Sequence, residues 1–167
     1  MKLVACFCVL ILAQLNFANG FEVVSANFQP PGETNPRPCK FIKVDGHMIL
    51  LPQRSSYRDV VHNHENSIWA VNYHETSNFD SVDLVISQDE RLFVIPNIWT
   101  ELEEKLKTNG LLPNVPLDRC HLTVTAVQAD TLSCTFRGLS NQIEKEVTKS
   151  LSVSVRRQVD SVAFEIL

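Results

Sequence analysis

Short runs of alternating apolar and polar residues fill most of the chain after residue 40, and turn-forming residues separate one run from the next. Alternation of this kind places every second side chain on one face of an extended strand, so it predicts half-buried β-strands. The stretch CKFIKVDGHMILLP combines both features, because Asp45-Gly46 between two apolar runs favours a tight hairpin turn. This turn predicts that Ile42 pairs with Ile49.

The same pattern predicts four further hairpins, within residues 57–73, 82–96, 119–138 and 151–167. In the hairpin within 82–96, a three-residue turn would place one set of apolar side chains on a single face: Val82, Leu84, Ile86, Leu92 and Val94. In the hairpin within 119–138, a turn centred on Asp130 sets Ala126 opposite Cys134.

Residues 97–110, NIWTELEEKLKTNG, follow a different period. Acidic residues come early and lysines late, Asn97 is a candidate N-cap and Gly110 a stop, so a helix is predicted near 98–108. With about nine to eleven short strands, the chain is expected to be all-β, or α+β, as an antiparallel sandwich or barrel. Residues 140–149 suit a helix or a strand equally well.

The first twenty residues, MKLVACFCVLILAQLNFANG, have the pattern of a secretory signal peptide. Lys2 supplies the positive charge, the apolar run after it is too short to span a membrane, and small residues precede a cut after Gly20. We therefore expect a secreted, extracellular protein with one β-rich domain over residues 21–167. The rest of the sequence contains no apolar run long enough to cross a membrane.

The charge balance argues against nucleic acid as a partner. The whole chain carries a formal net charge of −4, and removal of residues 1–20 leaves 14 basic and 19 acidic residues. Arg156-Arg157 is the only basic doublet, and no basic stripe of the kind that binds phosphate backbones is present.

Three of the five cysteines lie outside the signal peptide, in a chain expected to fold under oxidising conditions. We predict a disulfide between Cys39 and Cys120, which each precede a strand. The predicted hairpin puts Cys120 about 20 Å from Cys134, too far for a bridge. Cys134 is expected to be a buried, inert thiol, with a nucleophile or an intermolecular bridge as the alternatives.

The densest chemistry lies in VVHNHENSIWAVNYHE, residues 60–75, which holds three of the five histidines. His62 and His64 could face one metal ion, because alternate strand residues point the same way. His74 would lie over 20 Å away along the hairpin, so a third ligand would have to come from His47 or His121. A solvated polar turn is the favoured interpretation, and no cofactor is predicted.

Trp69 and Tyr73 share one strand face, which is either core or an aromatic platform for a ligand. The chain lacks familiar nucleophile, zinc-helix and phosphate-loop motifs. We therefore expect a non-catalytic binding protein that recognises an extracellular protein or small ligand through loops 29–40, 62–67 and 109–118. The alternatives are a secreted metal-dependent hydrolase that uses His62 and His64, and a carrier of a small apolar ligand.

Overall fold

The structure is a computed structural model that describes residues 15–16, 22–30, 32–44, 47–63, 67–88, 91–158 and 161–167. The chain forms two compact units, Met1–Gln53 and Arg54–Leu167, and each contains its own β-sheet. The prediction of a single domain over 21–167 stays a prediction. Among the described residues, no helix combines the length and the apolar character that crossing a membrane requires.

The smaller unit is a four-stranded antiparallel sheet in the order β1-β2-β3-β4. Its strands are β1 (Leu15–Asn16), β2 (Glu22–Phe28), β3 (Arg37–Val44) and β4 (His47–Leu50). Ile42 pairs with Ile49, as the sequence predicts, although the turn residues 45 and 46 lie outside the described residues. Strand β3 begins at Arg37, inside the segment predicted to be a loop, because it pairs with β2 as far as Phe28.

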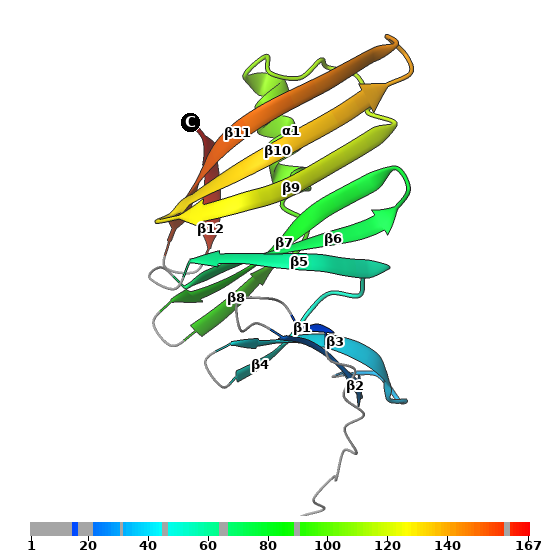
Figure 1. The fold of residues 1–167 in the computed structure, drawn as a ribbon, viewed down its shortest axis with the longest axis vertical. Helices are drawn as coiled ribbons and strands as arrows, with labels where there is room; N and C mark the ends of the chain where they lie inside the picture. Colours follow the sequence, from blue (N-terminus) through cyan, green and yellow to red (C-terminus); the bar gives the residue numbers. More distant parts are fainter. Residues whose placement is uncertain are drawn as a thin grey trace, which may run out of the picture. The chain divides into compact units, whose positions relative to one another are not determined.

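The larger unit is an eight-stranded sheet with the order β12-β11-β10-β9-β7-β6-β5, and β8 also pairs with β7 (Figure 1). Its strands are β5 (Ser56–Asn63), β6 (Ile68–Thr76), β7 (Phe79–Gln88), β8 (Arg91–Ile95), β9 (Arg119–Gln128), β10 (Thr131–Ser140), β11 (Lys145–Arg157) and β12 (Val162–Ile166). The pairings are antiparallel except for a short parallel contact between β7 and β9. The predicted antiparallel β class is confirmed, and the open strand order fits sheets of a sandwich rather than a closed barrel.

The predicted helix is present as α1 (Trp99–Thr108), which lies behind β9 and β10 in Figure 1. It buries Trp99, Leu102 and Leu106, and the Trp99 ring stacks on Phe136 of β10 with centroids 4.7 Å apart. Asn97 is not the N-cap: the cap position is Ile98, which has no side-chain cap bond.

A buried ion pair explains why Asn97 does not cap the helix. Asp83 on β7 is fully buried and binds Arg54 through two hydrogen bonds, of 3.1 and 2.7 Å. The backbone N–H of Asn97 donates to the same carboxylate at 2.8 Å, and the Asn97 side chain accepts a hydrogen bond from Ser81. Asn97 has a φ of +50°, so the segment before α1 is fixed by the carboxylate and not by a helix cap.

The core of the larger unit lies between α1 and one face of the sheet. Its buried side chains include Val82, Leu84, Ile86, Ile98, Trp99, Leu102, Leu106, Leu122, Val124, Leu132, Phe136, Val153, Val155 and Phe164. Gly138 of β10 is required here, because a Cβ at this position would lie 2.5 Å from Cζ of Phe136. The stacked rings and the glycine therefore fit together as one packed group.

The predicted turn between β7 and β8 is wrong by one residue. Gln88 pairs with Arg91, so the loop has two residues instead of three, and Ile86 faces Phe93. A shift of one residue turns every side chain of a strand to the other face. Phe93 and Ile95 consequently pack against the core, whereas Leu92, predicted to be buried, is 37% exposed.

Other predicted registers differ for identifiable reasons. The β9–β10 turn lies between Gln128 and Thr131 and is not centred on Asp130, so Ser133 and not Cys134 lies opposite Ala126. A β-bulge between Ser133 and Cys134 then shifts the pairing further and sets Cys134 opposite Val124. The bulge keeps the apolar residues on the core face on both sides of it. Residues 141–144 form a turn, and β11 starts at Lys145, which resolves the ambiguous segment 140–149 as mainly strand.

Candidate functional site

A cluster of charged and imidazole side chains lies around Asp80, the second residue of β7. His74 on β6 and His121 on β9 are its direct neighbours in the sheet, one on each side. The Nδ1 atoms of His74 and His121 lie 2.5 and 2.8 Å from the two carboxylate oxygens of Asp80. Arg58 of β5 completes this group, with NH1 3.3 Å from the carboxylate. We call Arg58, His74, Asp80 and His121 the histidine–aspartate cluster.

The local sequence explains why these side chains meet. Ser77 and Asn78 form the turn between β6 and β7, and a β-bulge between His74 and Thr76 then sets His74 opposite Asp80 across the hairpin. The carbonyl of Asn78 then accepts a hydrogen bond of 2.8 Å from the N–H of Cys120, which brings β9 alongside β7. A β-bulge near Tyr57 turns the side of β5 that carries Arg58 toward the same carboxylate.

The electrostatics of the cluster favour an ionised Asp80. Burial alone raises the pKa of Asp80, but the hydrogen bonds from His74 and His121 and the charge of Arg58 outweigh it and hold the pKa below its ordinary value. A contact of 2.5 Å between Nδ1 and a carboxylate oxygen requires a proton between them. Because Asp80 is the ionised partner, we assign that proton to the imidazole.

The cluster fixes both rings with Nδ1 as the donor. The Nε2 atoms of His74 and His121 have no hydrogen-bond partner among the described residues, and the two side chains are 33% and 30% exposed. Each Nε2 can therefore accept a hydrogen bond when the ring is neutral and donate one when it is charged. Within the described part of the chain, no three His, Cys, Asp or Glu side chains are grouped so as to hold a metal ion.

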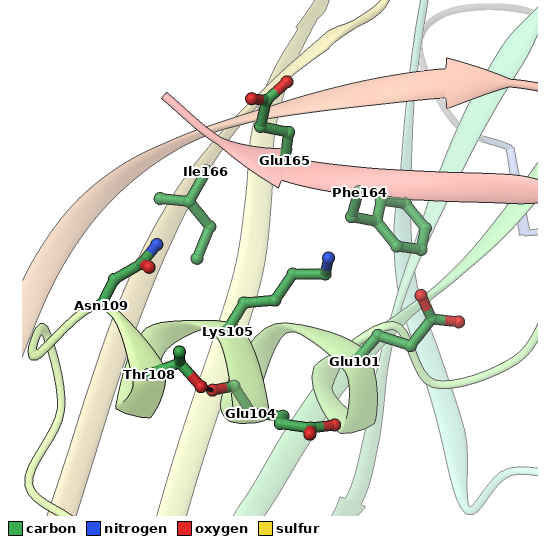
Figure 2. A pocket seen from close by; sticks show the side chains of 8 residues that line it. All are labelled: Glu101, Glu104, Lys105, Thr108, Asn109, Phe164, Glu165 and Ile166. Atoms are coloured by element: carbon green, nitrogen blue, oxygen red, sulfur yellow. Dashed lines mark hydrogen bonds between the residues drawn. The ribbon is translucent and has the colours of Figure 1, made fainter.

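A second candidate site is a groove of about 510 Å³ between α1 and β12, which we call the α1–β12 groove (Figure 2). It is lined by Glu101, Glu104, Lys105, Thr108, Asn109, Phe164, Glu165 and Ile166. Figure 2 shows Phe164 and Ile166 pointing from β12 toward the helix, whereas Glu165 points the other way. The groove therefore combines an apolar floor with charged side chains from α1.

Strand β12 lies at the end of the strand order, and among the described strands it pairs with β11 alone. The N–H of Leu167 donates to Ser152 on β11, and the N–H of Gln158 donates to Ser161. Backbone N–H and C=O groups alternate in direction along an antiparallel strand. Residues 161, 163, 165 and 167 therefore direct their N–H and C=O groups toward β11. The N–H and C=O groups of Val162, Phe164 and Ile166 consequently face the unpaired edge of the sheet.

Of the candidate metal-ligand histidines, the described His62 and His74 lie apart from each other. His62 pairs with Trp69 and stacks on its ring at 5.3 Å, whereas His74 follows Trp69 by five residues on β6, or about 17 Å along the strand. His64 lies outside the described residues, and so does the side chain of His47. The metal-site alternative at His62 and His64 thus stays a prediction, while His121 joins His74 at Asp80 instead.

Trp69 and Tyr73, the candidate aromatic platform, are 2% and 1% exposed and so are buried side chains. The guanidinium of Arg54 lies over the Tyr73 ring at 4.2 Å, and Tyr57 contacts that ring edge-on. Burial is the main cause that raises the pKa of Tyr73 to about 12. These contacts surround the Tyr73 ring, and the ligand platform at Trp69 and Tyr73 stays a prediction.

The predicted disulfide between Cys39 and Cys120 is not formed, and Cys39, Cys120 and Cys134 are all free and buried. Cys120 pairs with Gly138, four residues from Cys134, so these two thiols lie about 13 Å apart along the strand, beyond disulfide reach. Burial raises the pKa of Cys134 to about 12, and it also raises the pKa of Cys120. Both are poor nucleophiles in this environment.

Sequence reasoning did not find the histidine–aspartate cluster. The available signal was the turn pair Ser77-Asn78 between two alternating runs, which predicts the hairpin. The turn alone would set Glu75 opposite Asp80, and His74 reaches Asp80 only because of a β-bulge between His74 and Thr76. No local signal indicates that His121 joins them, because it comes from a parallel pairing between distant strands. The α1–β12 groove was equally hidden, although Asn109 in its lining begins the predicted binding loop 109–118.

Comparisons of this chain with protein-family models, with curated proteins and with solved structures find no match.

Proposed function

We propose that this chain is a secreted, non-catalytic binding protein whose α1–β12 groove receives an extended segment of a partner protein. The observation that carries the proposal is the unpaired edge of β12 beside a groove of about 510 Å³. An extended segment can add itself to such an edge as a further strand, with main-chain hydrogen bonds for affinity and side-chain pockets for specificity.

The backbone geometry supports an extended occupant. Val162, Phe164 and Ile166 direct their N–H and C=O groups toward the free edge, so an added strand would find alternating donors and acceptors there. Phe164 is 2% exposed and Ile166 partly buried, so the floor of the groove is anchored in the core. A rigid floor reduces the cost of ordering the site on binding.

The charges on α1 favour basic side chains in the partner. Glu101 and Glu104 line the groove and are exposed, whereas Lys105 is the single cation among the described lining residues. Glu165 is already paired with Arg156 on β11. A lysine or arginine of the partner can lay its methylene stem on the apolar floor and place its charge near the two glutamates.

Two of the sequence-based alternatives lack a supporting observation in the described residues. A hydrolase would need convergent metal ligands, and His62 is stacked on Trp69 instead. A carrier would need an enclosed apolar cavity, and the α1–β12 groove is an open one with four charged residues in its lining. A second copy of the chain could also occupy the edge, through antiparallel pairing of two β12 strands.

Fluorescently labelled peptides of alternating lysine and valine test this proposal, with alternating glutamate and valine as the charge-reversed probe. We expect the lysine peptide to bind, and the double variant Glu101→Gln with Glu104→Gln to weaken it at least tenfold in fluorescence anisotropy. Thr108→Trp should weaken it similarly, because the exposed Thr108 lines the groove and a large ring there would fill it. A lysine peptide interrupted by proline should bind poorly, since proline cannot form the ladder.

The matched control is Glu33→Gln with Glu144→Gln, which removes the same charge from exposed positions outside the groove. Equal loss of binding in this control would mean non-specific attraction to an acidic protein and would overturn the proposal. So would a concentration-dependent dimer that Thr108→Trp dissociates, because a second copy would then be the occupant. Secretion is tested separately, by N-terminal sequencing of exported protein, which should begin at Phe21.

A further inference from the structure

A row of basic and titratable side chains crosses five neighbouring strands on one face of the larger sheet. His74, Asp80, His121 and Arg137 are successive cross-strand partners on β6, β7, β9 and β10, and Arg58 reaches the row from β5. Directly paired residues share a face and lie about 5 Å apart. The row is separate from the α1–β12 groove, with which it shares no lining residue.

A small pocket of about 110 Å³ lies at the β9–β10 end of this row. It is lined by Arg119, His121, Arg137, Gly138, Leu139 and Glu146. Arg119 precedes His121 by two residues on β9 and therefore lies on the same face of the sheet. Arg119 is exposed and has no hydrogen bond or ion pair among the described residues, so its guanidinium is available to a ligand.

The charges of the pocket lining favour an anion. Arg137 is held by Glu146 of β11 through contacts of 2.6 and 3.3 Å, so that pair is nearly neutral. Arg119 then gives a positive excess, on a chain whose formal net charge is −4. His121 adds a second positive charge whenever its ring is protonated, and Asp80 behind it holds Nδ1 as the donor.

We propose that this pocket binds a small tetrahedral oxyanion, a phosphate or sulfate group, between Arg119 and Nε2 of His121, with Arg137 as a further donor. A guanidinium offers a planar set of N–H donors that matches such oxygens, and imidazolium adds one more charged N–H. His74 and Arg58 do not line the pocket. They act through Asp80, by sharing the carboxylate that fixes the His121 ring, and are positioning residues.

The same geometry makes binding depend on pH. The charged and titratable groups that face His121 are Arg58 from β5, His74 from β6, Asp80 from β7, Arg119 from β9, Arg137 from β10 and Glu146 from β11. A neutral His121 presents an acceptor at Nε2, which repels an oxyanion, whereas the protonated ring presents a donor. Protonation of the ring therefore favours the oxyanion, so affinity should rise as the pH falls.

Isothermal titration with sodium sulfate tests the proposal, because sulfate keeps the same charge between pH 5.5 and 7.5. We expect binding at least threefold tighter at pH 5.5. Arg119→Gln should weaken binding at least fivefold at pH 5.5 and at pH 7.5. This variant should fold normally, because Arg119 has no hydrogen bond or ion pair among the described residues. Glu146→Gln should tighten binding, since it removes the carboxylate that competes with the anion.

The histidine variants separate the binding residue from the positioning residue. His121→Gln should remove most of the pH dependence of sulfate affinity. His74 contacts the same Asp80 but lies outside the pocket, so His74→Gln should keep most of that pH dependence. Arg156→Gln is the control, because it removes an exposed arginine from β11 beside β12. Equal weakening by Arg156→Gln and Arg119→Gln, no gain from Glu146→Gln, or unchanged pH dependence in His121→Gln would each overturn the proposal.

A second titration distinguishes the source of the oxyanion. Inorganic phosphate is compared with phosphatidylcholine vesicles that contain or lack phosphatidic acid. Binding of free phosphate with the same variant pattern assigns the pocket to a soluble ion, and binding only to phosphatidic acid vesicles assigns it to a lipid headgroup. Absence of Arg119-dependent binding to sulfate, phosphate and vesicles alike would leave the pocket without the proposed ligand and refute the inference.

Discussion

The side-chain amide of Asn72 on β6 forms two hydrogen bonds with the backbone of Val124 on β9. Nδ2 donates to the carbonyl oxygen and Oδ1 accepts from the N–H, both at 2.9 Å. The two strands are not neighbours in the sheet, because β7 stands between them in the strand order. The amide therefore supplies the two backbone hydrogen bonds that a neighbouring strand would otherwise give Val124, at the point where β9 separates from β7.

Replacement of this amide should be among the most destabilising single changes in the larger unit. Asn72→Leu would leave the N–H and C=O of Val124 buried without partners, and we expect a loss of about 2 to 5 kcal/mol in the free energy of unfolding. Urea denaturation followed by circular dichroism measures it. Ser140→Ala is the control, because the buried hydroxyl of Ser140 has no hydrogen-bond partner among the described residues, so the change should be nearly neutral.

Gly138→Ala should destabilise the fold by about 1 to 3 kcal/mol, as overpacking of a tight core does. The new methyl group would lie 2.5 Å from Cζ of Phe136 and 3.1 Å from Leu117. Phe136 cannot turn away easily because its ring stacks on Trp99. The double variant Gly138→Ala with Phe136→Leu should lose less stability than the two single changes added together, and strict additivity would contradict this reading of the contact.

The lowered pKa of Asp80 predicts a specific loss of stability in acid. A carboxyl whose folded-state pKa lies below its unfolded value stabilises the fold above the unfolded pKa, and that contribution disappears as the pH falls through the folded one. The window thus lies below the ordinary Asp80 value of 3.8. Asp80→Asn should be less stable than the natural chain at pH 7, with the gap closing toward pH 2.

Asp59→Asn, an exposed change on β5, is the control. Its free energy of unfolding should depend on pH as that of the natural chain does. A gap between the Asp80→Asn variant and the natural chain that stays constant from pH 7 to pH 2 would show that the Asp80 contribution is not ionic.

The three thiols should be unreactive in the folded protein. A chain of residues 21–167, purified without reductant, should react with Ellman's reagent at Cys39, Cys120 and Cys134 only after unfolding, because all three are buried. The pKa of Cys134, raised to about 12, also leaves almost no thiolate at neutral pH. A count of one thiol after unfolding would instead reveal a disulfide, and peptide mapping would show whether Cys39 and Cys120 form it.

The parts of the fold that local sequence controls were predictable. The Asp45-Gly46 signal gives the pairing of Ile42 with Ile49, and the 3.6-residue period, with acidic residues early and lysines late, gives α1. The predicted strand registers were wrong where one residue more or less in a turn changes which sheet face the side chains occupy, as between Gln88 and Arg91. The bulge at Cys134 was also invisible, because it preserves the apolar pattern that sequence reasoning follows.

The candidate sites were much harder to predict than the strands. Asp80 meets His74 through a hairpin, but it meets His121 only through the parallel contact of β7 with β9. No residue near position 80 indicates that contact, so the histidine–aspartate cluster could be recognised only in the three-dimensional structure. The free edge of β12 likewise follows from the strand order of the whole sheet and not from the apolar pattern of residues 162–166.

The parallel contact of β7 with β9 also has a consequence for folding kinetics. The hairpins on either side join sequence neighbours, but Asp80 and His121 are separated by 41 positions. Closure of so long a loop costs chain entropy before any contact compensates for it, and contacts distant in sequence slow folding. We expect the two groups of hairpins to form first, and the acquisition of the native state to wait for the chain between them, with α1 inside it, to bring residue 121 to residue 80.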